Sequence, residues 1–364
     1  MRVLYVYSGG RELKKELLES HQAPSEFYYG YWELKQAGVE VDFIDVPEKT
    51  VATITSRFLN VFYYRWQMLP CRATGDLFVL LHRLISSLNV YDVVVATTTG
   101  IGFCLEILRF LRFLKRPVVT IHCGILNYSY NRPTEIVTTY LLQRSHSQVF
   151  GVGEFEGMQR RYGLDETQIG LNEFGVDTRF WCPDSLTKKE KYILSVGNCG
   201  RRDYDLLMRV AQEMAAPFKV VTDTAPHHVP NNVEILHGRL HAEYEIPDKE
   251  LRELYRQATA VIVPLMDSLQ PSGQSVALQA MACGTPVVLT ETAGIWNRNL
   301  LRDDYNCCLI RPGDVGHAKS KLSLLVENPD MSQALVDPAL KTVRDHWDIR
   351  YFSKKVYELC LSVS

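Results

Sequence analysis

The sequence contains no long hydrophobic run and no signal for export. None of its apolar stretches approaches the roughly 18 uninterrupted residues that a membrane-spanning helix needs. The N-terminus passes from Met1 and Arg2 directly into the apolar residues 3–7, without the small-residue cleavage site of a secretory leader. We therefore expect a cytoplasmic protein that is at most peripheral to a membrane.

Paired cysteines and metal-ligand spacing are also missing. The nine cysteines are an odd number and include no Cys-x-x-Cys pair, and the neighbours Cys307 and Cys308 could not easily close an unstrained disulfide. His227-His228 lacks zinc-site spacing, and Asp303-Asp304 reads as a solvated turn before a strand. We expect reduced thiols, no bound metal and no cofactor.

Neither the charge nor the composition is extreme. The net charge is −2, hydrophobic residues make up 46% of the chain and charged residues 23%, which excludes disordered and fibrous classes. There is no internal repeat. At 364 residues the chain exceeds what one hydrophobic core usually supports, so two domains are expected.

Short runs rich in Val and Ile alternate with helical segments, a pattern typical of parallel sheets covered by helices. The predicted class is therefore α/β, with two sheets. Strands are expected at residues 3–7, 41–44, 92–96, 118–121 and 148–152 in the first half, and at residues 192–196, 219–222, 233–236, 261–264, 287–289 and 308–310 in the second. Between the two sets, residues 172–183 are punctuated by Gly and Pro, and the predicted domains are 1–172 and 173–349.

Residues 271–288 combine a polar loop, a short helix and a buried strand. The Ser-Gly start at Ser272 and Gly273 leaves helix-end N–H groups unpaired and lets a ligand approach the backbone, which suits a diphosphate. Ser272, Ser275 and Gln279 follow helical spacing and share one face of a helix otherwise made of Val, Leu, Ala and Met. Such a polar stripe favours a ligand site over a solvated surface.

This block resembles the nucleotide-sugar site of retaining GT-B glycosyltransferases, the group 1 type, whose pattern is Glu, seven residues, then Glu-Ala-Met-Ala-x-Gly-x-Pro-Val. Gln279 occupies the second Glu position, and the first falls on Pro271. The stretch Ser272-Gly273-Gln274 is similar to a Ser-Gly-Gln form of the loop found in some members. An amide at position 279 can still bond ribose hydroxyls.

The resemblance implies a GT-B fold, in which two Rossmann-like domains turn their parallel sheets toward an interdomain cleft. It implies an N-terminal acceptor domain, a C-terminal donor domain, and a last helix at residues 350–364 that packs back on the first domain. The substrate implied is a nucleoside-diphosphate sugar.

The stretch 195–207 reads as a strand, a Gly-containing loop and a helix that Asp203 could cap. Loops of this kind lie at the edge where open α/β sheets bind ligands, and adjacent guanidiniums can neutralise a diphosphate without a metal. Asn198, Arg201 and Arg202 are therefore candidate donor-binding residues, with either arginine as the contact. The alternative is that both arginines are surface residues at a helix start.

Three further places hold candidate site residues. Gly9 and Gly10 follow the first strand and let the backbone approach a ligand, although a Gly-Gly pair also fits a plain turn; without a full G-x-G-x-x-G pattern a dehydrogenase is not expected. His122 ends a strand where the resemblance places a His that orients hydroxyls or relays a proton, and a structural His is the alternative. Gly238 and Arg239 fall in the family's nucleobase loop, where Arg239 either stacks on the base or is simply exposed.

The first half is the basic one. Residues 51–164 hold twelve Lys and Arg against six Asp and Glu, an excess of six positive charges. Residues 105–116 alternate large apolar groups with cations, and residues 62–66 add aromatic bulk, a combination that suits anionic lipid headgroups. The alternative is a core-facing helix whose arginines extend to solvent. No motif supports nucleic-acid binding.

Together these features predict a metal-independent glycosyltransferase. It would move a sugar, with retention, from a nucleoside-diphosphate donor to a hydroxyl of a glycan, lipid-linked or small-molecule acceptor. The missing first carboxylate leaves open a GT-B-like binding protein without activity, and a sugar-nucleotide epimerase of the same fold is the other alternative. The sequence leaves the base, the sugar and the acceptor open.

Overall fold

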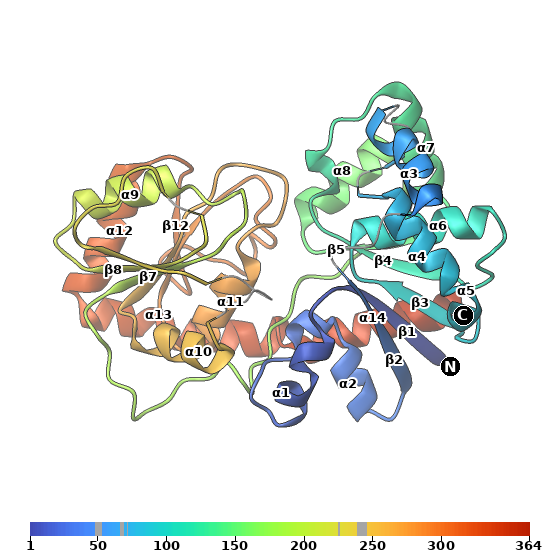
Figure 1. Cartoon of the computed structure of the whole chain (residues 1–364). Helices are drawn as coiled ribbons and strands as arrows, with labels where there is room; N and C mark the ends of the chain where they lie inside the picture. The colour runs from blue at the N-terminus through green and yellow to red at the C-terminus, as the bar shows by residue number, and fades with distance from the viewer. Residues whose placement is uncertain (48–52, 66–68, 71, 225, 239–245) are drawn as a thin grey trace. The chain divides into compact units, whose positions relative to one another are not determined.

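A computed structural model describes residues 1–47, 53–65, 69–70, 72–224, 226–238 and 246–364. The chain forms two compact units, and each contains one parallel sheet flanked by helices (Figure 1). Unit 1 comprises Met1–Lys15, Phe27–Glu173 and Phe352–Ser364. Unit 2 comprises Glu16–Glu26 and Phe174–Tyr351, so it includes a short piece of the N-terminal part of the chain.

The unit 1 sheet has six parallel strands in the order β2-β1-β3-β4-β5-β6. They are β1 Arg2–Ser8, β2 Glu40–Val46, β3 Val93–Ala96, β4 Val118–His122, β5 His146–Val149 and β6 Ile169–Leu171. The first five were predicted, although β5 ends at Val149 and Val152 already begins a helix. Strand β6 was not predicted, because three residues centred on Gly170 carry too little pattern.

The alternation of side chains along β1 explains how this sheet is covered on both faces. Leu4 and Val6 lie in one core with the buried face of helix α6. Tyr5 and Tyr7 point to the other face, where Tyr5 packs edge-on against Tyr31 at 6.0 Å between ring centroids. The helices of this unit are α2 Tyr31–Gln36, α3 Ile54–Asn60, α4 Gly75–Arg83, α5 Ile85–Leu88, α6 Thr99–Phe110, α7 Arg132–Leu142 and α8 Val152–Tyr162, with α1 Lys15–Glu19 at the edge of unit 2.

The last helix, α14 (Ile349–Val363), provides unit 1 with its C-terminal segment. Asn172 Nδ2 donates to the Phe352 carbonyl at 3.1 Å, and Ser353 Oγ donates to Glu33 Oε2 at 3.4 Å. Val356 and Cys360 are fully buried. Residues from both ends of the sequence therefore share one core.

The unit 2 sheet is also six-stranded and parallel, in the order β12-β11-β10-β7-β8-β9. Its strands, all of which were predicted, are β7 Ile193–Val196, β8 Phe218–Val221, β9 Val233–Leu236, β10 Ala260–Val263, β11 Val287–Thr290 and β12 Cys308–Ile310. Its helices are α9 Tyr204–Gln212, α10 Asp248–Gln257, α11 Gln274–Ala282, α12 Val315–Glu327 and α13 Pro329–His346. Helices α9 and α12 lie over one face, and α10 and α11 over the other (Figure 1).

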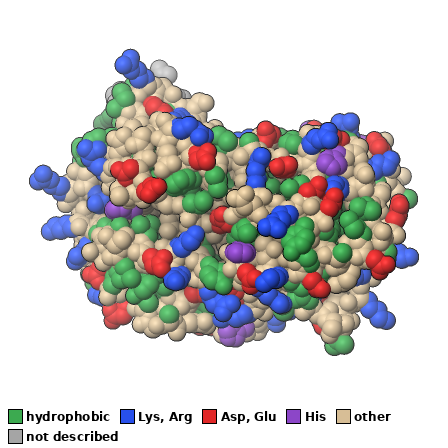
Figure 2. Space-filling view, turned by 180° about the vertical axis from the view of Figure 1, so that it is seen from behind, with side chains coloured by type: hydrophobic (Ala, Val, Ile, Leu, Met, Phe, Trp, Pro, Cys, Tyr) green, Lys and Arg blue, Asp and Glu red, His purple; other side chains and the backbone are tan. Residues whose placement is uncertain are grey.

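The surface carries charges of both signs. On the face that Figure 2 shows, Lys and Arg side chains are interspersed with Asp and Glu, in keeping with the net charge of −2. None of the helices within the described ranges has both the length and the apolar character needed to cross a bilayer.

Candidate functional site

Helix α11 begins in unit 2 with backbone groups that no side chain caps. Gly273 is its N-cap and adopts a left-handed conformation with φ of 80°. Because glycine has no side chain, the N-cap residue makes no capping hydrogen bond to the first N–H groups. Ser272 Oγ, next to it, is buried and has no hydrogen-bond partner among the described residues. The start of a nine-residue helix thus combines backbone N–H groups that its glycine N-cap cannot bond with a buried hydroxyl that has no partner among the described residues.

Arg202 lies beside this helix start. Its side chain is only 5% exposed, its Nε donates to the Val196 carbonyl at 3.1 Å, and its Nη1 is buried without a partner among the described residues. A Cβ atom at Gly273 would lie 3.3 Å from Nη1, and one at Gly197 would lie 2.3 Å from Nε. The guanidinium therefore fits between two glycines, and only residues without a side chain leave it that room.

The charge of Arg202 has no counterpart in the described part of the chain, because no carboxylate pairs with it. A buried guanidinium without an anion is costly, and such groups are normally paired. Together with the helix N-terminus, Arg202 makes a site that an anion would complete.

Arg201 differs from its neighbour. Its side chain is half-buried, and its backbone carbonyl accepts from Met266 N at 2.9 Å. Asp203 caps α9 as predicted, accepting from Leu206 N at 2.9 Å. The capped helix fixes the loop, so the two adjacent arginines occupy different environments.

Asn198 ties together the loops that follow three neighbouring strands. Its Nδ2 donates to the Gly238 carbonyl at 2.6 Å, and its Oδ1 accepts from Thr222 Oγ1 at 3.0 Å. Thr222 also accepts from Tyr204 Oη at 2.8 Å. The Asn198 amide therefore holds the carboxyl-end loops of β7, β8 and β9 in place. Arg239 lies outside the described residues.

The amide of Gln279 has protein partners at both ends. Its Oε1 accepts from Tyr255 Oη at 3.1 Å, and its Nε2 donates to Glu26 Oε1 at 2.9 Å. The side chain is 4% exposed, whereas Ser275, earlier on the same helix, is half-buried. The position that the resemblance assigned to the ribose is thus part of a buried network.

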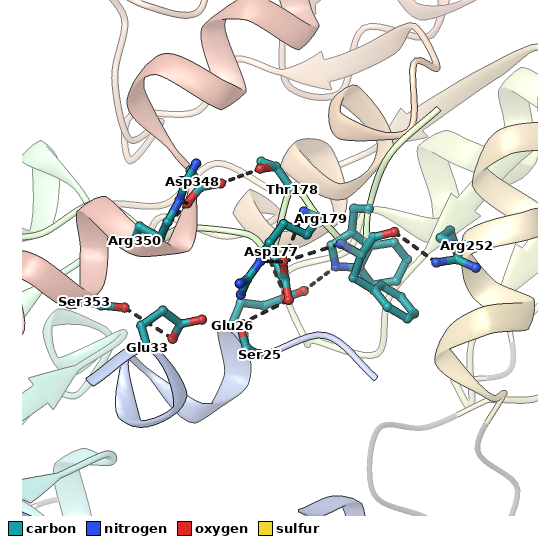
Figure 3. Close-up of polar contacts among 12 residues, drawn as sticks. Ser25, Glu26, Glu33, Asp177, Thr178, Arg179, Arg252, Asp348, Arg350 and Ser353 are labelled. Atoms are coloured by element: carbon teal, nitrogen blue, oxygen red, sulfur yellow. Dashed lines mark hydrogen bonds and ion pairs between the residues drawn. The ribbon is translucent and has the colours of Figure 1, made fainter. Parts of the chain in front are cut away.

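Glu26 is the residue that the sequence did not reveal. It is fully buried in unit 2, where its Oε1 also accepts from Trp181 Nε1 at 2.6 Å and its Oε2 accepts from Asp177 N at 3.2 Å. Figure 3 shows Glu26 and Asp177 lying together. Burial, and secondly the charge of Asp177, raise the pKa of Glu26 to about 8. Local pattern gave no signal, because its partners are more than 150 residues away.

His122 ends strand β4 in unit 1, as predicted. Its side chain is 1% exposed, its Nδ1 lies 3.1 Å from Thr99 Oγ1, and its Nε2 is buried without a partner among the described residues. Burial lowers the pKa of His122 to about 3, so the imidazole is neutral near pH 7. It can exchange a hydrogen bond but does not carry a charge.

The same edge of the unit 1 sheet carries the glycine turn and a second buried carboxyl. Gly9 and Gly10, after β1, both adopt left-handed conformations, with φ of 76° and 80°. Glu154 is fully buried in the first turn of α8 and accepts from Ile125 N at 2.8 Å, which fixes the loop after His122. Burial raises the pKa of Glu154 to about 7.

Two thiols are exposed near these loops. Cys123 directly follows His122, and Cys199 lies in the loop before Arg201; both are exposed free thiols. The buried free thiols are Cys104, Cys283, Cys307, Cys308 and Cys360. Over the described ranges, no group of three or more His, Cys, Asp or Glu residues is placed to hold a metal ion.

Part of the chain is similar to known glycosyltransferases. Residues 190–328 match the family model described as Glycosyl transferases group 1. The D-inositol 3-phosphate glycosyltransferase of Acidothermus cellulolyticus is 28% identical over 215 residues, 51% of this chain and 47% of that protein. The enzyme of the same name from Frankia alni is 36% identical over 94 residues, 26% of this chain and 22% of that protein. The matched region thus spans about half, or less, of the length of these relatives.

Solved structures share the whole fold. Sucrose-phosphate synthase from Thermosynechococcus elongatus superposes with a TM-score of 0.70 at 16% identity, with all of both chains covered. HepE from Anabaena, in complex with UDP and glucose, gives a TM-score of 0.67 at 14% identity, again over both whole chains. The predicted two-domain GT-B fold is confirmed.

Proposed function

We propose that this chain is a retaining glycosyltransferase whose second unit binds a nucleoside-diphosphate sugar at the start of helix α11. The observation that carries this proposal is Arg202: a buried guanidinium, without a carboxylate partner in the described chain, beside an uncapped helix N-terminus. A diphosphate would supply the missing anion. The match of residues 190–328 to group 1 glycosyltransferases supports the same chemistry.

The reaction follows from where charge develops. When the sugar leaves, negative charge grows on the departing diphosphate, and preorganised donors contribute most at that step. Arg202, the α11 N–H groups and the Ser272 hydroxyl would stabilise that charge without a metal ion. In unit 1, His122 offers a neutral imidazole to a sugar hydroxyl. No side chain is proposed as a nucleophile.

Gln279 keeps a role toward the ribose. A primary amide has two N–H donors and two acceptor lone pairs, and Glu26 and Tyr255 use one of each. The remaining N–H and lone pair are proposed to meet the ribose hydroxyls. Asn198 would act by holding the loops around the donor, whereas Gly9, Gly10, Gly238, Arg239, Gln274 and Ser275 stay predicted donor contacts.

We propose a uridine nucleotide as the first donor to test, since HepE is described with UDP, UDP-glucose and glucose. The acceptor is proposed to be anionic. The relatives named D-inositol 3-phosphate glycosyltransferases carry a phosphate compound in their name, and residues 51–164 hold the positive excess.

A peripheral membrane surface is proposed at the end of α6. The helix itself faces the core, with Leu105 and Leu108 fully buried, so the predicted lipid surface does not extend along residues 105–116. Its tail does differ: Phe110 is 62% exposed, and exposed apolar and basic residues follow it up to position 113. Exposed aromatic groups among arginines suit an anionic lipid surface.

The test is a binding screen followed by a transfer assay. Purified protein is titrated with UDP, GDP, ADP and UDP-sugars, and thermal unfolding is followed; a ligand at ~100 times its Kd adds about 2.7 kcal/mol to the stability of the native state. A transfer assay with labelled donor and candidate hydroxyl acceptors then identifies the product. Binding without turnover supports a binding protein, an isomerised donor supports an epimerase, and no nucleotide binding overturns the proposal.

A further inference from the structure

The contact between Glu26 and Gln279 joins a carboxyl and an amide from residues 253 positions apart. Both side chains are buried, and both lie in unit 2. Trp181 Nε1 donates to the same Glu26 oxygen, and Tyr255 Oη donates to the Gln279 oxygen. The amide nitrogen and the amide oxygen of Gln279 are therefore each hydrogen-bonded to a buried side chain.

We propose that Glu26 is a positioning residue of the donor site, which fixes the Gln279 amide so that its unused N–H and lone pair face the ribose. The proposal rests on the proposed function, because it assigns Gln279 to the ribose. Glu26 does not touch the donor itself, since it is fully buried.

The contact with Glu26 fixes which way the Gln279 amide faces. A primary amide can flip by half a turn and exchange its donor and acceptor ends, which would present the wrong atoms to a ribose hydroxyl. Glu26 Oε1 also accepts from Trp181 Nε1, so this oxygen is an acceptor whether or not the carboxyl is protonated, and the Tyr255 hydroxyl donates. Glu26 and Tyr255 together therefore allow one orientation.

The same contact explains why the acid of the family pattern is absent at position 279. A glutamate there would bring a second carboxyl within about 3 Å of Glu26, whose ionisation burial and Asp177 already disfavour, and two carboxyls at that distance cannot both ionise. In this chain the acid lies on Glu26 and the neutral partner on Gln279.

The test is the discrimination between UDP and 2′-deoxy-UDP, measured as the ratio of their Kd values by calorimetry. The variants are Glu26→Gln, Gln279→Glu and the double exchange of both. Ser25→Ala is the matched control, since it removes a hydroxyl of the neighbouring residue that donates to Asp177 Oδ2. Thermal unfolding checks that each variant folds.

The parent should bind UDP at least tenfold more tightly than 2′-deoxy-UDP, and Ser25→Ala should keep that ratio. Glu26→Gln should lower the ratio to about threefold or less, because an amide at position 26 supports both orientations of Gln279. Gln279→Glu should bind UDP at least tenfold more weakly. The double exchange should recover most of the ratio that Glu26→Gln loses. If Glu26→Gln fails to fold, Glu26→Asp replaces it, and this variant should lower the ratio because its carboxyl lies one methylene further from the Gln279 amide.

The outcomes separate the two proposals. If the parent binds no nucleotide, the proposed function falls, and this inference falls with it. If the parent binds UDP but the folded Glu26 variant keeps its ratio unchanged, or if the parent itself does not discriminate, Glu26 does not position the ribose contact and the donor site stands without it.

Discussion

Replacing Arg202 by glutamine separates a buried anion site from a surface charge. The change removes the positive charge and the Nη1 donor beside Gly273, while it keeps a polar group that reaches about as far as Nε. Arg202 has one protein hydrogen bond through Nε, to the Val196 carbonyl, so the apo protein loses little. The unfolding free energy of apo Arg202→Gln should lie within about 1 kcal/mol of the parent, since one ordinary hydrogen bond is exchanged for relief of a buried charge.

Nucleotide binding should respond far more strongly. A hydrogen bond to a charged group contributes about 1.5–3 kcal/mol, and each ~1.4 kcal/mol is a tenfold change in Kd. Arg202→Gln should therefore weaken UDP binding by about ten- to more than a hundredfold. Because the guanidinium is 5% exposed, this loss should persist in raised salt, which screens exposed charges much more than buried ones.

Arg201→Gln is the matched control, because it removes the same charge from the adjacent, half-buried position. Calorimetric titration with UDP, without metal and at two salt concentrations, should show a loss of no more than about threefold for Arg201→Gln. Equal losses in the two variants, or parent-like affinity in Arg202→Gln, would refute the assignment of the anion site to Arg202.

Four further predictions follow from other features. Gly273→Ala and Gly284→Ala, both at positive φ, should each lose about 1–2 kcal/mol of stability. Only Gly273→Ala should weaken UDP binding, because its Cβ would lie 2.7 Å from Val263 and 3.3 Å from Arg202 Nη1, whereas that of Gly284 would lie 3.4 Å from its nearest neighbour, Pro183. Melting curves and UDP titrations of the two variants check this. Transfer activity should survive excess chelator, and activity restored only by a divalent ion would contradict a metal-free site. Arg112 adopts φ of 62°, so Arg112→Gly should raise the melting temperature yet reduce flotation with anionic vesicles at 0.1 M salt, and unchanged flotation would remove this residue from the lipid surface. The folded-state pKa of Glu26, about 8, lies above the ordinary value of 4.5, so its contribution to stability is fully present below about pH 4.5 and is lost as pH rises to 8, by roughly 1.4 kcal/mol per pH unit. The unfolding free energy of Glu26→Gln, measured by chemical denaturation, should fall less steeply over this range. Parallel pH profiles of the variant and the parent would argue against a protonated Glu26.

The sequence predicted the parts of this fold that depend on local pattern. Strands such as β3, β10 and β11 are runs of buried residues, mainly Val, Ile, Leu and Ala, so they are visible without knowledge of their neighbours. Strand β6 is a three-residue edge strand with Gly170 at its centre, and its existence depends on pairing with β5 rather than on its own residues. The Asp203 cap was predictable for the same local reason.

The site was predictable only in its backbone elements. Ser272, Gly273 and the Arg201-Arg202 pair are close to glycines that mark ligand loops, so the motif predicted them. Which arginine is buried depends on Gly197 and Gly273 meeting in space, and the chain gives no local sign of it. Glu26 was invisible because its partners, Trp181 and Gln279, are 155 and 253 residues away.

Among the cysteines that the structure describes, Cys123 and Cys199 are exposed and offer two attachment points for spectroscopic probes. Burial raises the pKa of Cys104, Cys283 and Cys307 well above that of an ordinary thiol, so a maleimide at neutral pH should react with Cys123 and Cys199 before these three. Cys123 directly follows His122, the last residue of β4 in unit 1, and Cys199 lies in the loop before Arg201 in unit 2. A pair of spin labels or fluorophores there would measure the distance between the units in solution, with and without nucleotide, and no cysteine would have to be introduced.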